Sequence, residues 1–329
     1  MQPTLSPREF AFQNISVLRR VWRGVRDGEV ESLHQARIAT RRVRSALEVL
    51  DAGPDEIRLC RSLGRLFGRV RELDVTEELV SDYSARVPGA AAVLGIIRGE
   101  VDERRLRARR RLIKRLDTLR LRPLARIGGR RPLTALKFWT DWRESLIVAV
   151  SARTHALRQA LDDAPRVYMP NRLHRLRVAL KKLRYTLEIA QAAGTSIDDR
   201  IMRDARKIQD LLGRMHDVQT TRALIRQMQV SGRQMSDERQ LLDAVMTSDC
   251  ASLHATYLSK RERLHAVCDD AASLIVSRPA ARAGRVVLRA LPTVGMAALP
   301  VVIRRMAEFR VWRSRRDAPP GIRPPQAHA

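Results

Sequence analysis

Cysteines, aromatic side chains and long apolar runs are all scarce in this sequence. The 329 residues include only three cysteines, far apart and without a CxxC pair, which excludes a disulfide framework and offers no zinc-knuckle spacing. The longest apolar run, residues 290–303, contains two prolines and is shorter than the roughly 20 residues that span a bilayer. The first residues carry no basic segment followed by an apolar stretch. We therefore expect a cytoplasmic protein with neither a secretory signal nor a transmembrane segment.

Strand signals are also weak. Aromatic residues make up 4% of the chain, and the long segments repeat apolar residues at intervals of three and four. This pattern predicts an all-α fold. Helix breakers divide the chain into intervals that suit bundle helices; they are Gly53-Pro54, Pro88-Gly89, Gly128-Gly129, Ala164-Pro165, Gly194, Ser231-Gly232 and Arg278-Pro279.

Acidic residues are few relative to basic ones. There are 63 Lys and Arg residues against 36 Asp and Glu residues, a formal net charge of +27. A surface of that sign selects anionic partners such as nucleic acid, polyphosphate or anionic lipid. Most of the basic residues are arginine, whose planar guanidinium binds phosphate oxygens in pairs. The composition therefore favours a phosphate-bearing polyanion.

The chain contains an internal duplication. Residues 34–48 recur as residues 174–188, and residues 66–72 recur as residues 211–217. We infer two related halves, residues 8–120 and 140–272, within a domain of residues 1–275. Residues 276–329 then form a basic and apolar extension that ends in a tail expected to be disordered.

Each copy of the repeat places its basic residues on one face of a helix. In the first copy His34, Arg37, Arg41 and Arg44 fall within roughly an 80° sector, opposite a stripe of alanine, valine and leucine. Rows of arginine also follow the next helix of each half and a further helix at residues 104–115. The residues that we predict to bind the anion are His34, Arg37, Arg41, Arg42, Arg44, Arg58, Arg61, Arg65, Arg69, Arg107, Arg111, His174, Arg177, Lys181, Lys182, Arg184, Tyr185, Arg203, Arg206, Lys207 and Arg214.

A row of charges is usually only a solvated helix face. Here the rows have few of the carboxylates that normally alternate with basic residues, and like charges at this spacing are destabilising unless an anion joins them. The four acids on the basic faces, Glu48, Glu72, Glu188 and Asp217, are interpreted as partners that hold arginines in place. For the matched His34 and His174, a hydrogen bond to phosphate and a structural role are the main alternatives, ahead of metal binding.

The repeats resemble the CHAD family, the conserved histidine α-helical domain. The resemblance rests on His34-x-x-Arg37 with Arg41-Arg42, on the matching segment from His174 to Glu188, and on residues 67–75; Glu72 stands where the family usually has Asp. It implies two four-helix bundles related by a pseudo-twofold axis, with a basic central cleft that binds inorganic polyphosphate and can take the protein to polyphosphate granules. The chain has no ExExK signature of the hydrolase domain fused to some relatives, so we expect a stand-alone, non-catalytic domain without cofactor or metal.

Three other functions compete with polyphosphate binding. A metal-dependent phosphohydrolase or its accessory would require a carboxylate cluster or a phosphate loop on the basic stripes, and neither motif is present. Sequence-independent nucleic-acid binding suits the arginines but not the scarcity of aromatics that stack on bases. The basic and apolar residues 281–315 suit association with a membrane or a granule surface, or packing back on the bundle.

Overall fold

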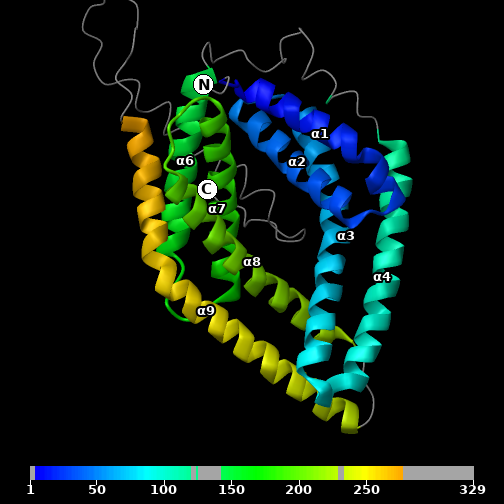
Figure 1. Cartoon of the computed structure of the whole chain (residues 1–329). Helices are drawn as coiled ribbons and strands as arrows, with labels where there is room; N and C mark the ends of the chain where they lie inside the picture. The colour runs from blue at the N-terminus through cyan, green and yellow to red at the C-terminus, as the bar shows by residue number, and fades with distance from the viewer. Residues whose placement is uncertain (1–3, 120–123, 125–141, 229–232, 277–329) are drawn as a thin grey trace, which may run out of the picture. The chain divides into compact units, whose positions relative to one another are not determined.

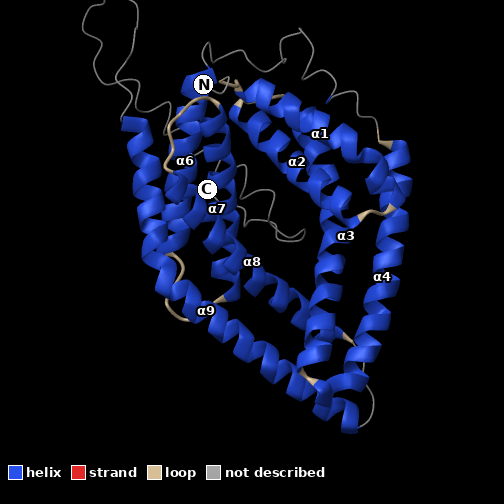
Figure 2. Ribbon diagram, in the orientation of Figure 1, coloured by secondary structure: helices blue, strands red, loops and turns tan. Residues whose placement is uncertain are grey.

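The secondary structure is helical in the part of the chain that the structure describes (Figure 2). The structure is a computed structural model and describes residues 4–119, 124, 142–228 and 233–276. This part contains eight long α-helices and one short 3₁₀-helix, which confirms the predicted all-α class. They are α1 (Pro7–Asp27), α2 (Val30–Val49), α3 (Pro54–Arg86), η1 (Pro88–Ala90), α4 (Ala91–Thr118), α6 (Trp142–Asp162), α7 (Pro170–Ala192), α8 (Asp199–Gln227) and α9 (Arg233–Val276).

Local sequence signals set the ends of several helices. The Ser6 hydroxyl accepts the Glu9 N–H, and the Glu9 carboxylate accepts the Ser6 N–H, so a capping box starts α1. Gly53-Pro54 starts α3, as the breaker pattern predicts. Gly28 ends α1 with φ of 86°, a left-handed conformation that favours glycine. Gly28 is a helix breaker beyond those predicted from the sequence.

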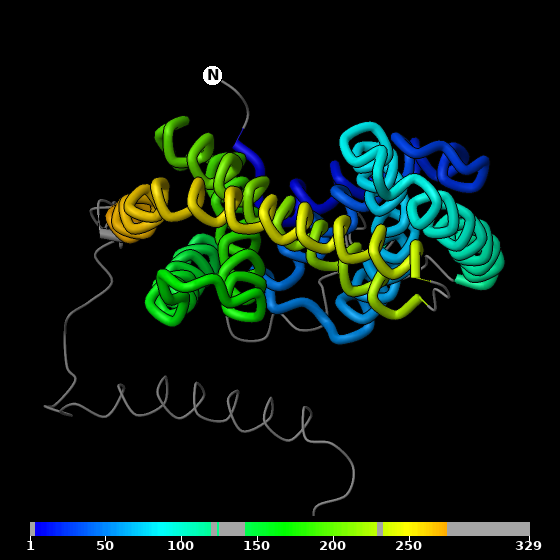
Figure 3. The backbone as a smooth tube through the Cα atoms, turned by 90° about the horizontal axis from the view of Figure 1, so that it is seen from below, coloured from blue at the N-terminus to red at the C-terminus, as the bar shows by residue number. Residues whose placement is uncertain are grey.

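The helices form two groups of four. In the first group α1 packs on α2, α2 on α3 and α3 on α4; in the second group α6, α7, α8 and α9 pack in the same succession. The two groups meet where α2 contacts α7 and where α3 contacts α8 (Figure 1). The long helix α9 continues from the second group to η1 and α4 of the first (Figure 3). The pseudo-twofold axis implied by the resemblance stays a prediction.

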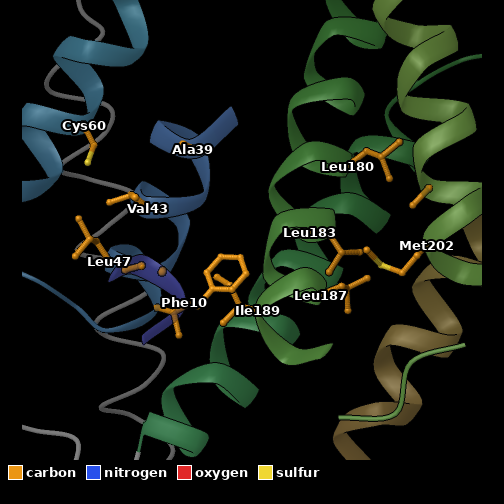
Figure 4. Packing of buried hydrophobic residues seen from close by; sticks show 14 of the residues in the cluster. Phe10, Ala39, Val43, Leu47, Cys60, Leu180, Leu183, Leu187, Ile189 and Met202 are labelled. Atoms are coloured by element: carbon orange, nitrogen blue, oxygen red, sulfur yellow. The ribbon is translucent and has the colours of Figure 1, made fainter. Parts of the chain in front are cut away.

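One apolar core extends through both groups of helices. Val43 and Leu47 of α2 are fully buried, as are Leu183 and Leu187 of α7, and all four belong to the same cluster (Figure 4). These residues are opposite the basic stripes, as the helical periodicity predicts. Truncating one such leucine to alanine typically costs about 2–5 kcal/mol, so the apolar faces fix the orientation of the basic ones.

A second apolar cluster lies where the far ends of α3 and α4 meet α8 and α9. It includes Tyr83, Ile97 and Met246. Residues 1–278 form one compact unit, and residues 279–329 lie outside the described residues. No helix in the described ranges is long and apolar enough to span a membrane.

Candidate functional site

A cavity of about 630 Å³ is walled by α2, α3, α7 and α8, where the two groups of helices meet. We call it the central cavity. Its lining is mainly basic, with seven arginines and two histidines against three acids. The basic residues are His34, Arg37, Arg41, Arg65, Arg69, Arg71, Arg177, Arg214 and His216. The helix periodicity turns these side chains away from the apolar core, so the cavity gathers positive charge from both halves of the chain.

The α3 and α8 walls of the central cavity correspond position by position. The lining residues 65, 68, 69, 71, 72 and 75 of α3 recur in α8 at an offset of 145, as residues 210, 213, 214, 216, 217 and 220. The sequence repeat is therefore also a repeat of wall positions. The charge is not repeated throughout, because Arg65 corresponds to Asp210 and Arg71 to His216.

Two arginines with buried Nε atoms line the central cavity, one from α2 and one from α7. Arg37 of α2 and Arg177 of α7 each have a buried Nε–H without a hydrogen-bond partner among the described residues. Burial, with nearby arginines, lowers the pKa of Arg37 to about 10, and burial also lowers the pKa of Arg177. An unpartnered buried donor costs roughly 1–3 kcal/mol, and more when charged. A bound anion would remove this cost.

Arg177 packs against a glycine of the opposite helix. A Cβ atom added to Gly213 of α8 would lie 3.7 Å from Arg177 Nε. That is an ordinary van der Waals distance, so the guanidinium lies close against α8 but would still accept a methyl group at position 213. Gly213 matches Gly68 in the repeat, and both glycines line the central cavity.

A second cavity of about 410 Å³, the side cavity, adjoins the central one between α2, α3 and α7. Arg41 and Arg65 line both cavities. The other basic residues of the side cavity are Arg44, Arg61, Lys181 and Lys182. Burial, followed by the charges of Arg41 and other nearby arginines, lowers the pKa of Lys181 to about 6.

Two histidines of the second half lie next to each other. The rings of His174 and His216 have centroids 4.7 Å apart. Burial and the charge of Arg177 lower the pKa of His216 to about 4, and the same causes lower the pKa of His174. Both imidazoles are therefore mainly neutral near pH 7, and each has one N–H to donate. His216 lines the central cavity, as does His34 of the first half.

The acids of the cavity do not neutralise it. Burial raises the pKa of Asp217 despite the opposing effect of Arg177, Arg37 and Arg71. Glu72 approaches Arg69 at 3.9 Å, a long contact between exposed groups that contributes little. Among the described residues, His, Cys, Asp and Glu side chains form no group of three suited to hold a metal ion.

A third hollow of about 370 Å³ lies between α3 and α4; we call it the α3–α4 groove. It contains the predicted row of α4 together with two arginines of α3, and its basic residues are Arg65, Arg69, Arg104, Arg107, Arg111 and Arg115. Buried Asp74 of α3 holds α4 in place by accepting from Arg105 at 2.6 Å and from Arg109 at 3.4 Å. The arginines of α4 reach the groove beside α3 and do not line the central cavity.

The matched glutamates of the repeat pair with arginines of the opposite half. Glu188 of α7 accepts a hydrogen bond from Arg42 Nε of α2 at 2.9 Å and also pairs with Arg184. Glu48 of α2 accepts from Arg153 of α6 at 3.2 Å. These ion pairs join the two halves, in agreement with the interpretation of both glutamates as partners of arginines.

The structure places the other predicted residues outside the central cavity. Arg42 and Arg184 belong to the ion pairs of Glu188, and the Arg184 guanidinium lies 4.4 Å from the centre of the Tyr185 ring. Arg58 pairs with Asp55 near the start of α3. His174 of α7 and three residues of α8 are exposed and line none of the three hollows; the α8 residues are Arg203, Arg206 and Lys207.

Some lining residues were not predicted. Arg71, Gln209 and His216 line the central cavity but were absent from the predicted set. The offset of 145 would have linked His216 to Arg71, because each stands directly before the acid that ends the repeated segment, residues 68–72 and 213–217. Gln209 has another function, since its amide oxygen accepts from Arg184 Nε at 2.8 Å.

Residues 281–315, predicted to contact a membrane or granule surface or to pack back on the bundle, lie outside the described residues.

Comparison with known families agrees with these features. The family model of the CHAD domain matches residues 10–226, about two thirds of the chain. This chain belongs to the CHAD domain family. The match begins in α1 and ends in α8, so it includes both copies of the repeat and all four walls of the central cavity.

Solved structures share the fold of this CHAD protein. The crystal structure of the CHAD domain from the plant Ricinus communis superposes with a TM-score of 0.62 at 20% identity, covering 81% of this chain and 95% of that one. PptA from Streptomyces chartreusis superposes with a TM-score of 0.56 at 16% identity, covering 83% and 98%. At these identities the likeness concerns the fold alone. A search of curated proteins finds no match.

Proposed function

We propose that this CHAD protein binds inorganic polyphosphate in its central cavity and side cavity, without catalysing its turnover. The observation that carries the proposal is the pair of buried guanidiniums, Arg37 and Arg177, whose Nε–H groups have no partner among the described residues. Because their donors are unsatisfied and their pKa values are lowered, a counter-anion would stabilise these guanidiniums, and a phosphate chain supplies acceptors and negative charge together.

The chemistry of the lining favours phosphate over nucleic acid. Of the described residues that line the central cavity, none is Phe, Tyr or Trp. Base stacking on aromatic rings is a main source of affinity for single-stranded nucleic acid. Among the described residues, the central cavity offers no Phe, Tyr or Trp ring, and the one such residue of the side cavity, Tyr185, lies against the Arg184 guanidinium. Guanidiniums and neutral imidazoles are donors that suit a polymer made only of phosphates. Binding of this kind would hold the protein on polyphosphate granules in the cytoplasm.

Reversing two charges at the cavities tests the proposal. Arg41 lines both cavities and Lys181 lines the side cavity, so the double variant Arg41→Glu/Lys181→Glu places two carboxylates where phosphates would bind. We expect affinity for long-chain polyphosphate to fall about 100-fold or more, since removing a close charge partner typically costs roughly 2–5 kcal/mol. Isothermal titration calorimetry measures the affinity, and circular dichroism checks that helicity is unchanged.

A matched control distinguishes binding at a defined site from general electrostatic attraction of polyphosphate. Arg203→Glu/Arg206→Glu makes the same change in net charge on exposed residues of α8 outside all three hollows. Its affinity should fall only several-fold at moderate salt, because exposed charges are screened. Equal losses in the two variants would show that polyphosphate is attracted by net charge alone, and an unaffected cavity variant would refute the site.

A further inference from the structure

The α3–α4 groove carries cations that the central cavity does not use. Of its basic residues, Arg104 and Arg107 pair with Glu100, and Arg107 also pairs with Glu103. Arg65, Arg111 and Arg115 are in no ion pair among the described residues, and all three are exposed. Unpaired arginines that face one another across a groove repel, and an anion between them would remove the repulsion.

The groove is continuous with the other two hollows. Arg65 lines the central cavity, the side cavity and the groove, and Arg69 lines the central cavity and the groove. On a helical projection Arg65 and Arg69 lie roughly 40° apart on α3, between the residues that face the central cavity and those that face α4. These two arginines therefore form the border that a linear anion would cross on leaving the central cavity.

The groove is long enough to hold several phosphates. Its α4 row runs from Arg104 to Arg115, and eleven residues of α-helix rise about 16 Å. The row is fixed relative to α3 because buried Asp74 accepts from Arg105 and Arg109. A chain lying here would be bound along its length by arginines of both helices.

The second half does not provide an equivalent border. The residue that matches Arg65 in α8 is Asp210, which carries the opposite charge. Two arginines of α8 are already paired with α9, since Asp243 accepts from Arg222 Nη2 at 2.7 Å and from Arg226 Nη2 at 3.0 Å. The unpaired positive charge thus continues from the central cavity toward α4 and not toward α9.

We infer that a polyphosphate chain leaves the central cavity across Arg65 and Arg69 and continues along the α3–α4 groove, which acts as a second binding segment for long chains. The inference rests on the proposed function and adds a chain-length preference to it. Short chains fill the central and side cavities alone, whereas chains long enough to reach α4 gain the contacts of Arg111 and Arg115.

The test compares two double variants of α4 with polyphosphates of graded length. Arg111→Gln/Arg115→Gln removes the two unpaired charges that α4 contributes to the groove and keeps good helix formers. Arg98→Gln/Lys114→Gln removes the same charge from exposed residues of α4 that do not line the groove. Calorimetric titration of each full-length variant gives the affinity for short and for long chains.

The groove variant should lose about tenfold in affinity (roughly 1.4 kcal/mol) for long chains and less than about twofold for short ones. The salt dependence of long-chain binding should become shallower by about two in its logarithmic slope, because two phosphate contacts are lost. The α4 control should change the affinity for either length by less than about twofold.

Two results overturn the inference, and they are distinguishable. If the groove variant matches the α4 control for all lengths while Arg41→Glu/Lys181→Glu abolishes binding, the groove is not a binding segment and the proposed function stands. If the unmodified protein binds neither short nor long chains, the proposed function fails and the inference fails with it.

Discussion

The two halves of the molecule differ most in their last helices. Helix α4 of the first half has nine basic and four acidic residues, whereas α9 of the second half has five basic and seven acidic ones. Both helices pack against the helix that walls the central cavity on their side, α3 or α8. In the first half this packing leaves arginines unpaired, and in the second half it produces ion pairs around Asp243.

The difference shows that the duplicated elements supply the scaffold, while charge distinguishes the halves. Wall positions of α3 and α8 correspond throughout the central cavity, and so do the buried faces of α2 and α7. At single positions such as Arg65 and Asp210 the sign of the charge is reversed. A repeat can therefore keep its core and still direct a polyanion to one side, because exposed charges change at little cost to folding.

The largest predicted effect is a loss of stability when an ion pair between the halves is removed. Glu188 is 7% exposed and holds Arg42 and Arg184, whereas the matched Glu48 is 26% exposed and holds Arg44 and Arg153. Glu188→Gln should lower the free energy of unfolding by about 3 kcal/mol, because it leaves two guanidiniums without a counter-charge.

Glu48→Gln is the matched comparison for that variant. Its effect should be about 1 kcal/mol, because the Glu48 carboxylate itself is more exposed to solvent than that of Glu188. Urea denaturation followed by circular dichroism measures both variants. If Glu48→Gln costs as much as Glu188→Gln, the two pairs are equivalent and the halves are joined symmetrically.

Exchanging the charges at the matched wall positions should have the next largest effect. Arg65→Asp removes the cation that all three hollows share, so affinity for long-chain polyphosphate should fall about tenfold, or roughly 1.4 kcal/mol. Asp210→Arg adds a cation to the opposite wall and should raise affinity several-fold. The salt dependence of titrations checks both variants. A higher affinity of Arg65→Asp for polyphosphate would contradict the proposed difference in charge between the two halves.

The smallest predicted effect is the dependence of polyphosphate affinity on pH. The pKa of Lys181 is near 6, chiefly because the amine is buried and then because Arg41 of α2 and Arg177, Arg37 and Arg184 surround it. A bound polyanion favours the charged amine and raises this pKa, so binding takes up a proton. Affinity should therefore decrease as pH rises, about fivefold between about pH 6.5 and about pH 7.5.

Lys181→Arg isolates this contribution, because a guanidinium stays charged throughout the range. Polyphosphate, His174 and His216 titrate in the same way with the unmodified protein and with the variant. The difference between the two pH profiles of affinity is therefore due to Lys181. If both profiles have the same slope, Lys181 does not change protonation on binding.

Much of the fold followed from the sequence. The spacing of Val43 and Leu47 predicted the buried face of α2, and that of Leu183 and Leu187 predicted the buried face of α7. The buried face of a helix can be predicted from its own sequence, because an apolar stripe must be buried whichever helix it packs against. The same reasoning placed Arg37, Arg41 and Arg177 on the opposite faces, and the structure brings all three to the central cavity.

The remaining features of the site depend on which helices meet, and no local pattern encodes that. Arg42 directly follows Arg41 of the first basic stripe and Arg184 belongs to the stripe of the second copy, yet Glu188 pairs with both of them. Arg111 shares its spacing with the arginines of α3 but lines a separate groove, because α4 packs on the outer side of α3. Only the tertiary structure shows which cations are paired and which are unpaired.

The most direct test of polyphosphate binding is competition at about 150 mM salt, where general attraction to phosphate backbones is already weakened. Labelled long-chain polyphosphate is bound to the full-length protein and displaced with unlabelled polyphosphate, double-stranded DNA or single-stranded DNA at equal phosphate concentration. We predict that unlabelled polyphosphate displaces the label at concentrations orders of magnitude below those of either DNA. Equal displacement by DNA would contradict the account and make the cavity a general electrostatic groove.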